Sequence, residues 1–325
     1  MKASKIARSG LALLRIYAGG KVPLKISHYI TYRCNLRCRF CEAWKNSGKD
    51  EMGTGQTREA MESFRRMGAV SWSISGGEPF LREDLPELLG YAKSLGYITS
   101  VVTNGTFPER IRSVAGNVDL LLISIEGGRK ETDFYRGAGT FDKVMRTLSA
   151  VKESRINANL NTVIKPDNLA QIKFIIGLAE EYGIFCGFQP VFDYRSGREV
   201  EEIVRSPGSL GRLRANIDYI AGEKRRGAPI LNSASYLKYI RNYGSPGFRR
   251  LRCFAGINTV LLEPDGALKR CYWDRKPVKT GGWEKAFNEV GRPPQGCYCW
   301  PKCHGENNLM FSMNMEAVLN AMKKI

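Results

Sequence analysis

Short apolar runs alternate with amphipathic stretches along most of this chain. The runs are rich in β-branched residues, and the stretches between them carry apolar residues three and four positions apart. These two periods predict strands and helices in alternation, which is typical of a parallel sheet built from βα units. Six strands are expected, at 24–31, 71–75, 98–103, 120–125, 157–164 and 185–191. Helices are expected between them, at 57–67, 85–95, 141–154 and 169–182.

The pattern changes after a basic helical stretch at 210–226. Residues 260–262 and 267–272 predict a hairpin around a turn of Pro264, Asp265 and Gly266. The predicted fold class is therefore α/β, a partial (β/α)6 barrel similar to a TIM barrel, followed by a small C-terminal domain. We expect an N-terminal helix at 1–20, the barrel at 21–230 and the C-terminal domain at 231–325. Functional residues in such a barrel lie where the parallel strands end.

Composition narrows the class of protein. Of the 325 residues 43% are hydrophobic, which is enough for a sizeable core and excludes a disordered chain. No apolar run approaches the roughly 18 residues that a membrane-spanning helix needs. The N-terminus shows no secretory signal, so we expect a reducing, cytoplasmic location. The nine cysteines are clustered, and in a reducing compartment such clusters indicate metal sites.

The net charge of +18 is concentrated near the N-terminus, where nine of the first 41 residues are Lys or Arg and none is acidic. On a helical wheel of residues 1–20 the apolar and basic side chains fall on opposite sides, with Ile16 as the exception. Two uses are open: peripheral contact with an anionic membrane, or packing on the barrel with the charges in water. A nucleic-acid partner is not expected, because no RNA-binding motif is visible. The apolar side comprises Ile6, Leu11, Leu13, Leu14 and Tyr17, and the basic side Lys2, Lys5, Arg8 and Arg15.

A cysteine triplet follows the first predicted strand. Cys34, Cys38 and Cys41 form the pattern CxxxCxxC on a loop at the carboxyl end of that strand. Three thiolates this close can bind three irons of a 4Fe-4S cube and leave the fourth iron without a protein ligand. An open metal position is a place for a substrate or cofactor. The alternative is a zinc knuckle, which needs a fourth ligand, and the nearest candidate, His28, lies within the strand.

The triplet and a second motif resemble the radical S-adenosylmethionine (SAM) superfamily over about residues 24–200. The second motif, Gly76-Gly77-Glu78-Pro79, follows the second predicted strand and matches the GGEP motif of that family. The resemblance implies that this motif holds the methionine amino group of SAM and that Phe40 lies against the adenine. It also implies polar contacts to SAM where the later strands end. The implied cofactor contacts are Phe40, Gly76, Gly77, Glu78, Pro79, Thr103, Asn104, Ser124, Glu126, Thr162 and Gln189.

Five further cysteines lie near the C-terminus. The spacing of Cys253, Gly266 and Cys271 resembles the opening of the auxiliary-cluster domains called SPASM or Twitch. Twelve residues separate the first two of these positions, and four separate the last two. The full SPASM pattern has more cysteines, so the resemblance implies a single second 4Fe-4S cluster here. Its ligands would be Cys253, Cys271 and two of the three that follow, with Cys303 favoured over Cys297 and Cys299. A structural zinc ion stays open as the alternative, and Cys186 is expected to be a packing residue.

The resemblance implies reductive cleavage of SAM to a 5'-deoxyadenosyl radical, which attacks a C–H or C=C bond, and an electron donor such as flavodoxin or ferredoxin. Whether the enzyme is an oxidoreductase or a transferase stays open, and no catalytic residue can be named. Our first hypothesis for the substrate is a hydrophobic small molecule or lipid, such as an isoprenoid. A second is a peptide or protein side chain. A third, from another class, is a zinc protein that binds nucleic acid through a basic surface.

Overall fold

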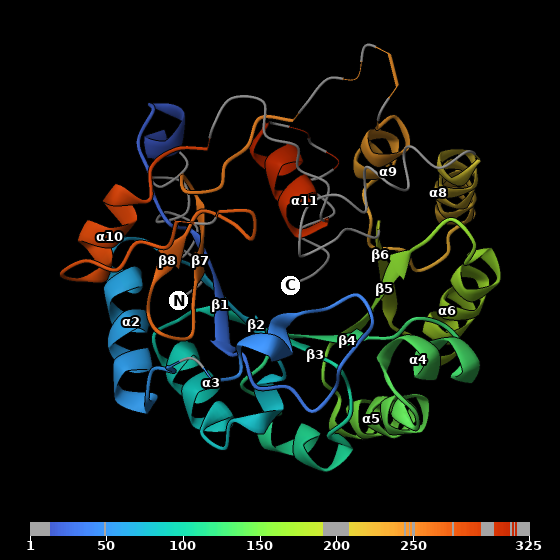
Figure 1. The fold of residues 1–325 in the computed structure, drawn as a ribbon, viewed down its shortest axis with the longest axis horizontal. Coiled ribbons are helices and arrows are strands. Elements are labelled where there is room, and N and C mark those ends of the chain that lie inside the picture. Colours follow the sequence, from blue (N-terminus) through green and yellow to red (C-terminus); the bar gives the residue numbers. More distant parts are fainter. Residues whose placement is uncertain are drawn as a thin grey trace.

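The computed structural model describes residues 14–48, 50–190, 208–243, 251–274, 276–293 and 302–312, together with 245, 246, 248, 314 and 316. An eight-stranded sheet lies at its centre, in the order β6-β5-β4-β3-β2-β1-β7-β8. Figure 1 shows this sheet curved into an open arc, with helices on its outer side. The predicted partial barrel is therefore confirmed.

The six predicted strands pair in parallel and in chain order. The sixth is described as far as Pro190, and its predicted last residue, Val191, lies outside the described residues. The observed strands are β1 (Lys25–Thr31), β2 (Ser71–Gly76), β3 (Ile98–Thr103), β4 (Leu120–Ser124), β5 (Ala158–Ile164) and β6 (Phe185–Pro190).

The predicted helices are present, with shifted ends. The first begins three residues earlier than predicted, at Thr54, where the Gly53 N–H donates to the Gln56 side chain (3.2 Å) and so starts the helix. Four described helices were not predicted, at 129–136, 234–241, 283–289 and 302–311. The described helices are α2 (Thr54–Arg66), α3 (Leu85–Ser94), α4 (Arg129–Arg136), α5 (Thr140–Ser154), α6 (Leu169–Tyr182), α8 (Ser209–Arg225), α9 (Ala234–Arg241), α10 (Trp283–Glu289) and α11 (Lys302–Phe311), with short 3-10 helices η1 (Ala43–Asn46), η2 (Pro79–Leu81) and η3 (Pro108–Val114).

The hydrophobic core lies between the sheet and the outer helices. Along β1, Ile26 and Ile30 are fully buried and belong to the same cluster as Phe64 of α2. Successive side chains of a strand point to opposite faces, so Lys25 and Tyr29 face the inside of the arc and line a cavity there. The apolar face of each strand thus packs against helices, and the polar face is left for the interior.

The predicted C-terminal hairpin is confirmed as β7 (Thr259–Leu262) and β8 (Leu268–Lys269), which pair antiparallel. Its first strand also pairs in parallel with β1, with Lys25 opposite Thr259. The turn requires Gly266, whose φ of +87° is in the left-handed region. The hairpin, which we expected in a separate small domain, therefore continues the barrel sheet.

Helix α11 lies between the two ends of the open arc (Figure 1). On one side the Glu306 carboxylate accepts a hydrogen bond from the Ser233 N–H (2.8 Å), which precedes α9. On the other side the side-chain oxygen of the buried Asn308 accepts from the Phe254 N–H (3.0 Å). Helix α11 thus links the segment after β6 to the segment before β7.

The end of the N-terminal segment differs from the helical-wheel prediction. Ile16 is 3% exposed and packs with Phe254 and Phe311, although the wheel placed it among the basic residues. Leu14 is 70% exposed and Tyr17 is 46% exposed. Tertiary packing therefore buries Ile16, the apolar residue that lies outside the predicted apolar side of the helix. Residues 1–13, which include most of that apolar side, lie outside the described residues.

We predict that Asn308→Ala lowers the free energy of unfolding by about 1–3 kcal/mol, because the Phe254 N–H would stay buried without its acceptor. Urea denaturation followed by circular dichroism measures this. The matched control is Asn288→Ala at an exposed position of α10, which should change stability by less than about 0.5 kcal/mol. Equal effects of the two substitutions would contradict the linking role of α11.

Candidate active site

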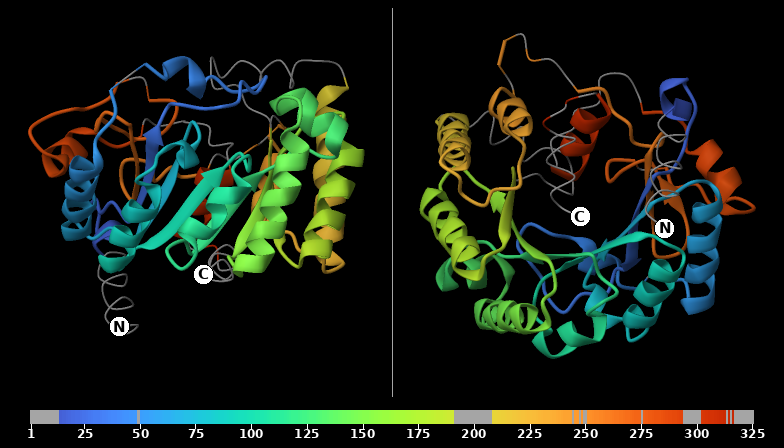
Figure 2. Two further views of the ribbon diagram at one scale, coloured as in Figure 1. Left: turned by 90° about the horizontal axis from the view of Figure 1, so that it is seen from below. Right: turned by 180° about the vertical axis from the view of Figure 1, so that it is seen from behind.

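The cysteine loop begins where β1 ends and crosses over the carboxyl ends of the strands, as Figure 2 shows for the blue segment that leads into η1. Cys34, Cys38 and Cys41 are all partly buried, and none of them forms a disulfide. The Cys41 N–H donates to the Cys38 carbonyl (3.1 Å), and the Leu36 N–H lies 3.5 Å from the Cys34 sulfur. The three thiols thus lie on one tight loop at the functional end of the barrel.

The cysteine loop is attached on both sides. The Asn35 amide donates to the Thr106 hydroxyl (2.8 Å) and accepts from the Asn104 amide (2.9 Å), just beyond β3. Farther along, the Arg39 N–H donates to the Tyr135 carbonyl of α4 (2.9 Å). These hydrogen bonds join the loop to two elements that are distant in sequence.

The glycine pair after β2 packs directly against the start of the cysteine loop. The Gly77 N–H donates to the Thr31 carbonyl (2.7 Å), and the Glu78 N–H donates to the Arg33 carbonyl (2.8 Å). A Cβ on Gly77 would lie 2.1 Å from the Arg33 oxygen, and one on Gly76, whose φ is +121°, would lie 2.3 Å from the Thr31 oxygen. Only glycine fits at either position.

Glu78 joins the ends of β2 and β3. Its fully buried carboxylate accepts hydrogen bonds from the Phe80 N–H (3.1 Å), the Thr103 hydroxyl (2.9 Å) and the Asn104 N–H (2.7 Å). Burial raises the pKa of this carboxyl to about 7, although the hydrogen bonds act in the opposite direction. The adjoining Pro79 is buried and begins η2. The structure therefore brings together Glu78, Thr103 and Asn104, which the sequence assigned to the same site.

Glu126 lies between two cations that sequence reasoning missed. Its buried carboxylate is 2.7 Å from the Arg136 guanidinium and 3.0 Å from the Lys165 ammonium. The Arg136 guanidinium also lies 5.4 Å from the centroid of the Phe40 ring. Its buried Nε has no hydrogen-bond partner among the described residues. Arg136 lies on the unpredicted α4, so periodicity gave no reason to place it here.

The remaining predicted contacts lie at the ends of β4, β5 and β6. Ser124 is the last residue of β4 and is nearly buried. The Thr162 hydroxyl donates to the Ile125 carbonyl (2.8 Å) and so connects β5 to β4. Gln189 faces the interior. The structure places these three side chains along the functional edge, and their roles toward SAM stay predictions.

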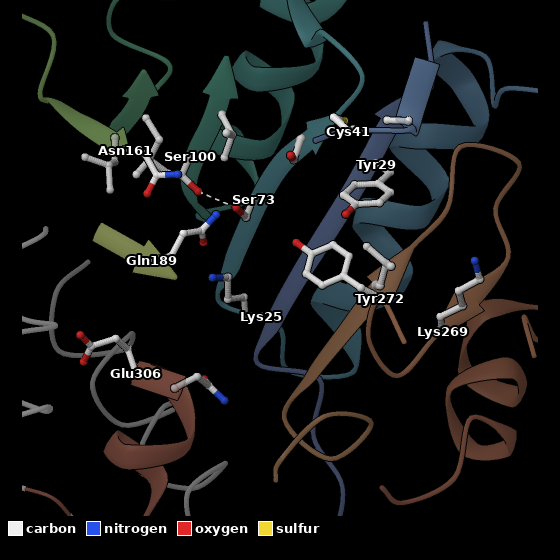
Figure 3. Close-up of a pocket in the computed structure, with 18 of the residues that line it drawn as sticks. Lys25, Tyr29, Cys41, Ser73, Ser100, Asn161, Gln189, Lys269, Tyr272 and Glu306 are labelled. Atoms are coloured by element: carbon white, nitrogen blue, oxygen red, sulfur yellow. Dashed lines mark hydrogen bonds between the residues drawn. The ribbon is translucent and has the colours of Figure 1, made fainter. Parts of the chain in front are cut away.

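A cavity of about 570 Å³ occupies the inside of the arc and reaches the cysteine loop at Cys41. Two tyrosines form part of its wall, Tyr29 on β1 and Tyr272 in the turn that follows β8, with ring centroids 5.5 Å apart (Figure 3). Tyr272 lies one residue after Cys271, so the segment that follows the hairpin also reaches the cavity. The polar lining comes from inward-facing strand residues, Ser73, Ser75, Ser100, Asn159, Asn161 and Gln189.

The cysteine loop fits an iron-sulfur cluster. Burial raises the pKa of the Cys34 thiol to about 11 and also raises the pKa of Cys38, so both need a bound cation to persist as thiolates. A cube binds each thiolate at a different iron and does not require them to converge on one point. In the part of the chain that the structure describes, no three His, Cys, Asp or Glu side chains converge on one metal ion.

His28 is not placed to complete a zinc site with the triplet. Its ring is 1% exposed and lies edge-on to Trp72, with centroids 5.4 Å apart, on the helix-facing side of β1. Neither ring nitrogen has a partner among the described residues. Burial lowers the pKa of His28 to about 3, so the ring is neutral. His28 therefore acts as a core residue.

The C-terminal cysteines are only partly described. Cys253 and Cys271 are partly buried and flank the β7–β8 hairpin. Cys297 and Cys299 lie outside the described residues, and for Cys303 only the backbone, in α11, is described. The second cluster therefore stays a prediction. Cys186, in contrast, is 0% exposed in β6, which confirms that it is a packing residue.

None of the helices in the described ranges has the length and apolar character needed to cross a membrane.

Comparison with known proteins agrees with this geometry. The family model for the radical SAM superfamily matches residues 28–179. Fe-coproporphyrin III synthase of Methanosarcina barkeri is 31% identical over 61% of this chain and 50% of its own length. Mycofactocin maturase MftC of Mycolicibacterium smegmatis is 28% identical over 78% of this chain and 65% of its own length. PqqA peptide cyclase of Xanthomonas campestris pv. campestris is 30% identical over 50% of this chain and 45% of its own length.

The chain thus spans 45–65% of the length of these curated relatives. Among solved structures, anSMEcpe with bound AdoMet, which is SAM, matches with a TM-score of 0.60 and 18% identity over 78% of this chain and 76% of that one. This likeness shows a shared fold. The matched residues 28–179 include the cysteine loop, the glycine pair and Glu126. Residues 28–179 of the chain therefore match the radical SAM superfamily, whose cofactors are a 4Fe-4S cluster and SAM.

Proposed function

We propose that this chain is a radical SAM enzyme that modifies a side chain of a peptide or protein. The observation that carries the proposal is the cavity of about 570 Å³ that adjoins the cysteine loop and is lined by both polar and apolar side chains. Its walls offer hydroxyl and amide groups, which suit the backbone and polar side chains of a peptide. An isoprenoid, our first hypothesis from the sequence, has no groups to pair with these side chains, so burying them against it would be unfavourable.

When bound, the cluster and SAM supply a 5'-deoxyadenosyl radical that can abstract hydrogen from an unactivated C–H bond. Cys34, Cys38 and Cys41 hold the cluster in this proposal. The close backbone approach at Gly76 and Gly77 leaves a smooth surface for the methionine end of SAM. The unpartnered Nε of Arg136 is a donor for the SAM carboxylate.

The names of two relatives support a peptide substrate. One is called a peptide cyclase and another a maturase, and the maturase match covers 78% of this chain. The tetrapyrrole enzyme Fe-coproporphyrin III synthase supports a second candidate, a substrate rich in carboxylates.

We also propose one auxiliary cluster at Cys253, Cys271 and two of the later cysteines. Peripheral membrane contact through residues 1–20 stays a separate proposal, consistent with the 70% exposure of Leu14.

We propose that an acidic electron donor, such as flavodoxin or ferredoxin, docks beside the cysteine loop. Arg33, Arg37 and Arg39 are exposed on that loop, and Lys45 is exposed just beyond it. Phe134 is 52% exposed under the Arg39 guanidinium, which lies 4.0 Å from the ring centroid. A basic rim around an exposed ring suits a transient partner of opposite charge.

We predict that the wild-type chain, reconstituted anaerobically, binds about eight irons and forms 5'-deoxyadenosine after reduction by dithionite. Replacing Cys34, Cys38 and Cys41 together by Ala should abolish deoxyadenosine and remove about half of the iron, because one cube is lost. Replacing Cys253 and Cys271 by Ala should halve the iron but keep the electron paramagnetic resonance signal of the first cluster. Colourless wild-type protein that contains zinc and forms no deoxyadenosine would contradict the enzyme proposal.

Gly77→Ala tests the close approach of the glycine pair to the cysteine loop. The new Cβ must displace the Arg33 carbonyl, and a shift of about 1 Å at a reacting centre can cost about 100-fold in rate. We expect that loss in deoxyadenosine formation measured by chromatography. The control, Gly177→Ala in α6, meets nothing within 4 Å and should keep the rate of the wild type. A fully active Gly77→Ala variant would contradict this account.

Charge reversal tests the donor surface. The double substitution Arg37→Glu and Lys45→Glu should slow reduction of the cluster by flavodoxin by about 10-fold or more at low salt, because electrostatic steering is lost. Reduction by dithionite, a small molecule, should change much less. The control is Arg66→Glu with Lys152→Glu, two exposed residues near the other end of the barrel. If both pairs slow flavodoxin equally, only net charge matters and the docking surface lies elsewhere.

A further inference from the structure

The end of the cavity remote from the cysteine loop contains a lysine. Lys25 is the first residue of β1, is partly buried and lines the cavity. Figure 3 shows it with Gln189 of β6 and Tyr272 around the same space. At about 3.3 Å per residue, β1 separates Lys25 from the cysteine loop by about 20 Å along the strand. An anchor at Lys25 would therefore hold a substrate at a distance from the reacting end.

The Lys25 ammonium has no partner in the described part of the chain: no carboxylate lies within 4.0 Å and no hydrogen bond is formed by its side chain. The other lysine of the cavity wall differs, because Lys269 lies 3.2 Å from the Glu263 carboxylate. A lysine on a cavity wall that has no counter-ion is available to an anionic group of a ligand.

The acidic groups of the cavity wall already have donors. Glu263 also accepts a hydrogen bond from the Tyr32 hydroxyl. Glu42 pairs with Lys45 (2.7 Å), and Glu306 accepts from the Ser233 N–H (2.8 Å). These contacts leave Lys25 as the unpaired charge among the described lining residues.

A second polar group of the wall lacks a partner. Asn159 of β5 is 2% exposed and lines the cavity, and its buried side-chain oxygen forms no hydrogen bond with any described residue. Buried amide oxygens are nearly always paired with protein, water or ligand. This oxygen suits an N–H donor, whereas the Lys25 ammonium suits an anion. The described part of the cavity wall therefore contains one cation without a counter-ion and one hydrogen-bond acceptor without a donor.

We infer that Lys25 binds a carboxylate of a peptide substrate, an acidic side chain or the C-terminus, while Asn159 accepts from a backbone N–H of the same peptide. Peptides combine carboxylates with N–H donors on one flexible chain. The carboxylates of a coproporphyrin would satisfy Lys25 but occur without backbone amides. This inference rests on the proposed function, because it takes the cavity as the substrate chamber.

The test uses the reconstituted holoenzyme with SAM and two probe peptides, acetyl-Ala-Gly-Glu-Gly-Ala-amide and its Gln counterpart. Calorimetry should show that the wild type binds the Glu peptide about 10-fold or more tightly than the Gln peptide, as expected for a hydrogen bond between charged groups. Lys25→Gln should abolish this preference, and Lys25→Arg should retain it. The control Lys143→Gln changes an exposed lysine on α5 and should leave the preference intact.

Equal binding of the two peptides by the wild type, or a preference that persists in Lys25→Gln, would overturn the inference. Coproporphyrin III is measured in parallel. If Lys25→Gln weakens its binding but leaves peptide binding unchanged, the lysine serves a tetrapyrrole carboxylate and the peptide assignment is wrong. Deoxyadenosine formation is recorded separately for every variant. Its absence in the wild type would count against the proposed function, while the calorimetry still decides whether Lys25 is a carboxylate site.

Discussion

Two backbone hydrogen bonds, from Gly77 to Thr31 and from Glu78 to Arg33, hold the turn after β2 against the start of the cysteine loop. They form because neither glycine of the pair has a Cβ, and any side chain there would overlap backbone oxygens. The Glu78 carboxylate then extends the connection to Asn104 beyond β3. The position of the cysteines relative to the barrel depends on this short chain of backbone contacts.

The alternation of side chains along each strand divides the barrel into two environments. Residues such as Ile26 and Trp72 face the helices and form the core, whereas Lys25, Ser73 and Asn159 face inward. Stability therefore comes from one face of the sheet, and the other face is available to bind a substrate. Because β6 and β8 are the outer strands of an open arc, the arc needs a separate element at its gap, and α11 lies there.

Buried charge in the site is largely compensated. Glu126 is neutralised by Arg136 and Lys165, whose attraction offsets the cost of removing all three from water. Lys25, in contrast, has no counter-ion among the described residues, and in our proposal it marks the end of the cavity that binds the substrate.

The sequence alone determined the strand positions, the cysteine triplet and the glycine pair. Each of these depends on residues that are adjacent or a few positions apart, so periodicity and spacing carry the information. Tertiary structure alone decided that Arg136 and Lys165 reach Glu126, that Ile16 is buried, and that α11 lies at the gap of the arc. It also decided that Lys25 has no partner among the residues that the structure describes. Such contacts join segments far apart in the chain, and their formation depends on how the sheet curves, which no local pattern records.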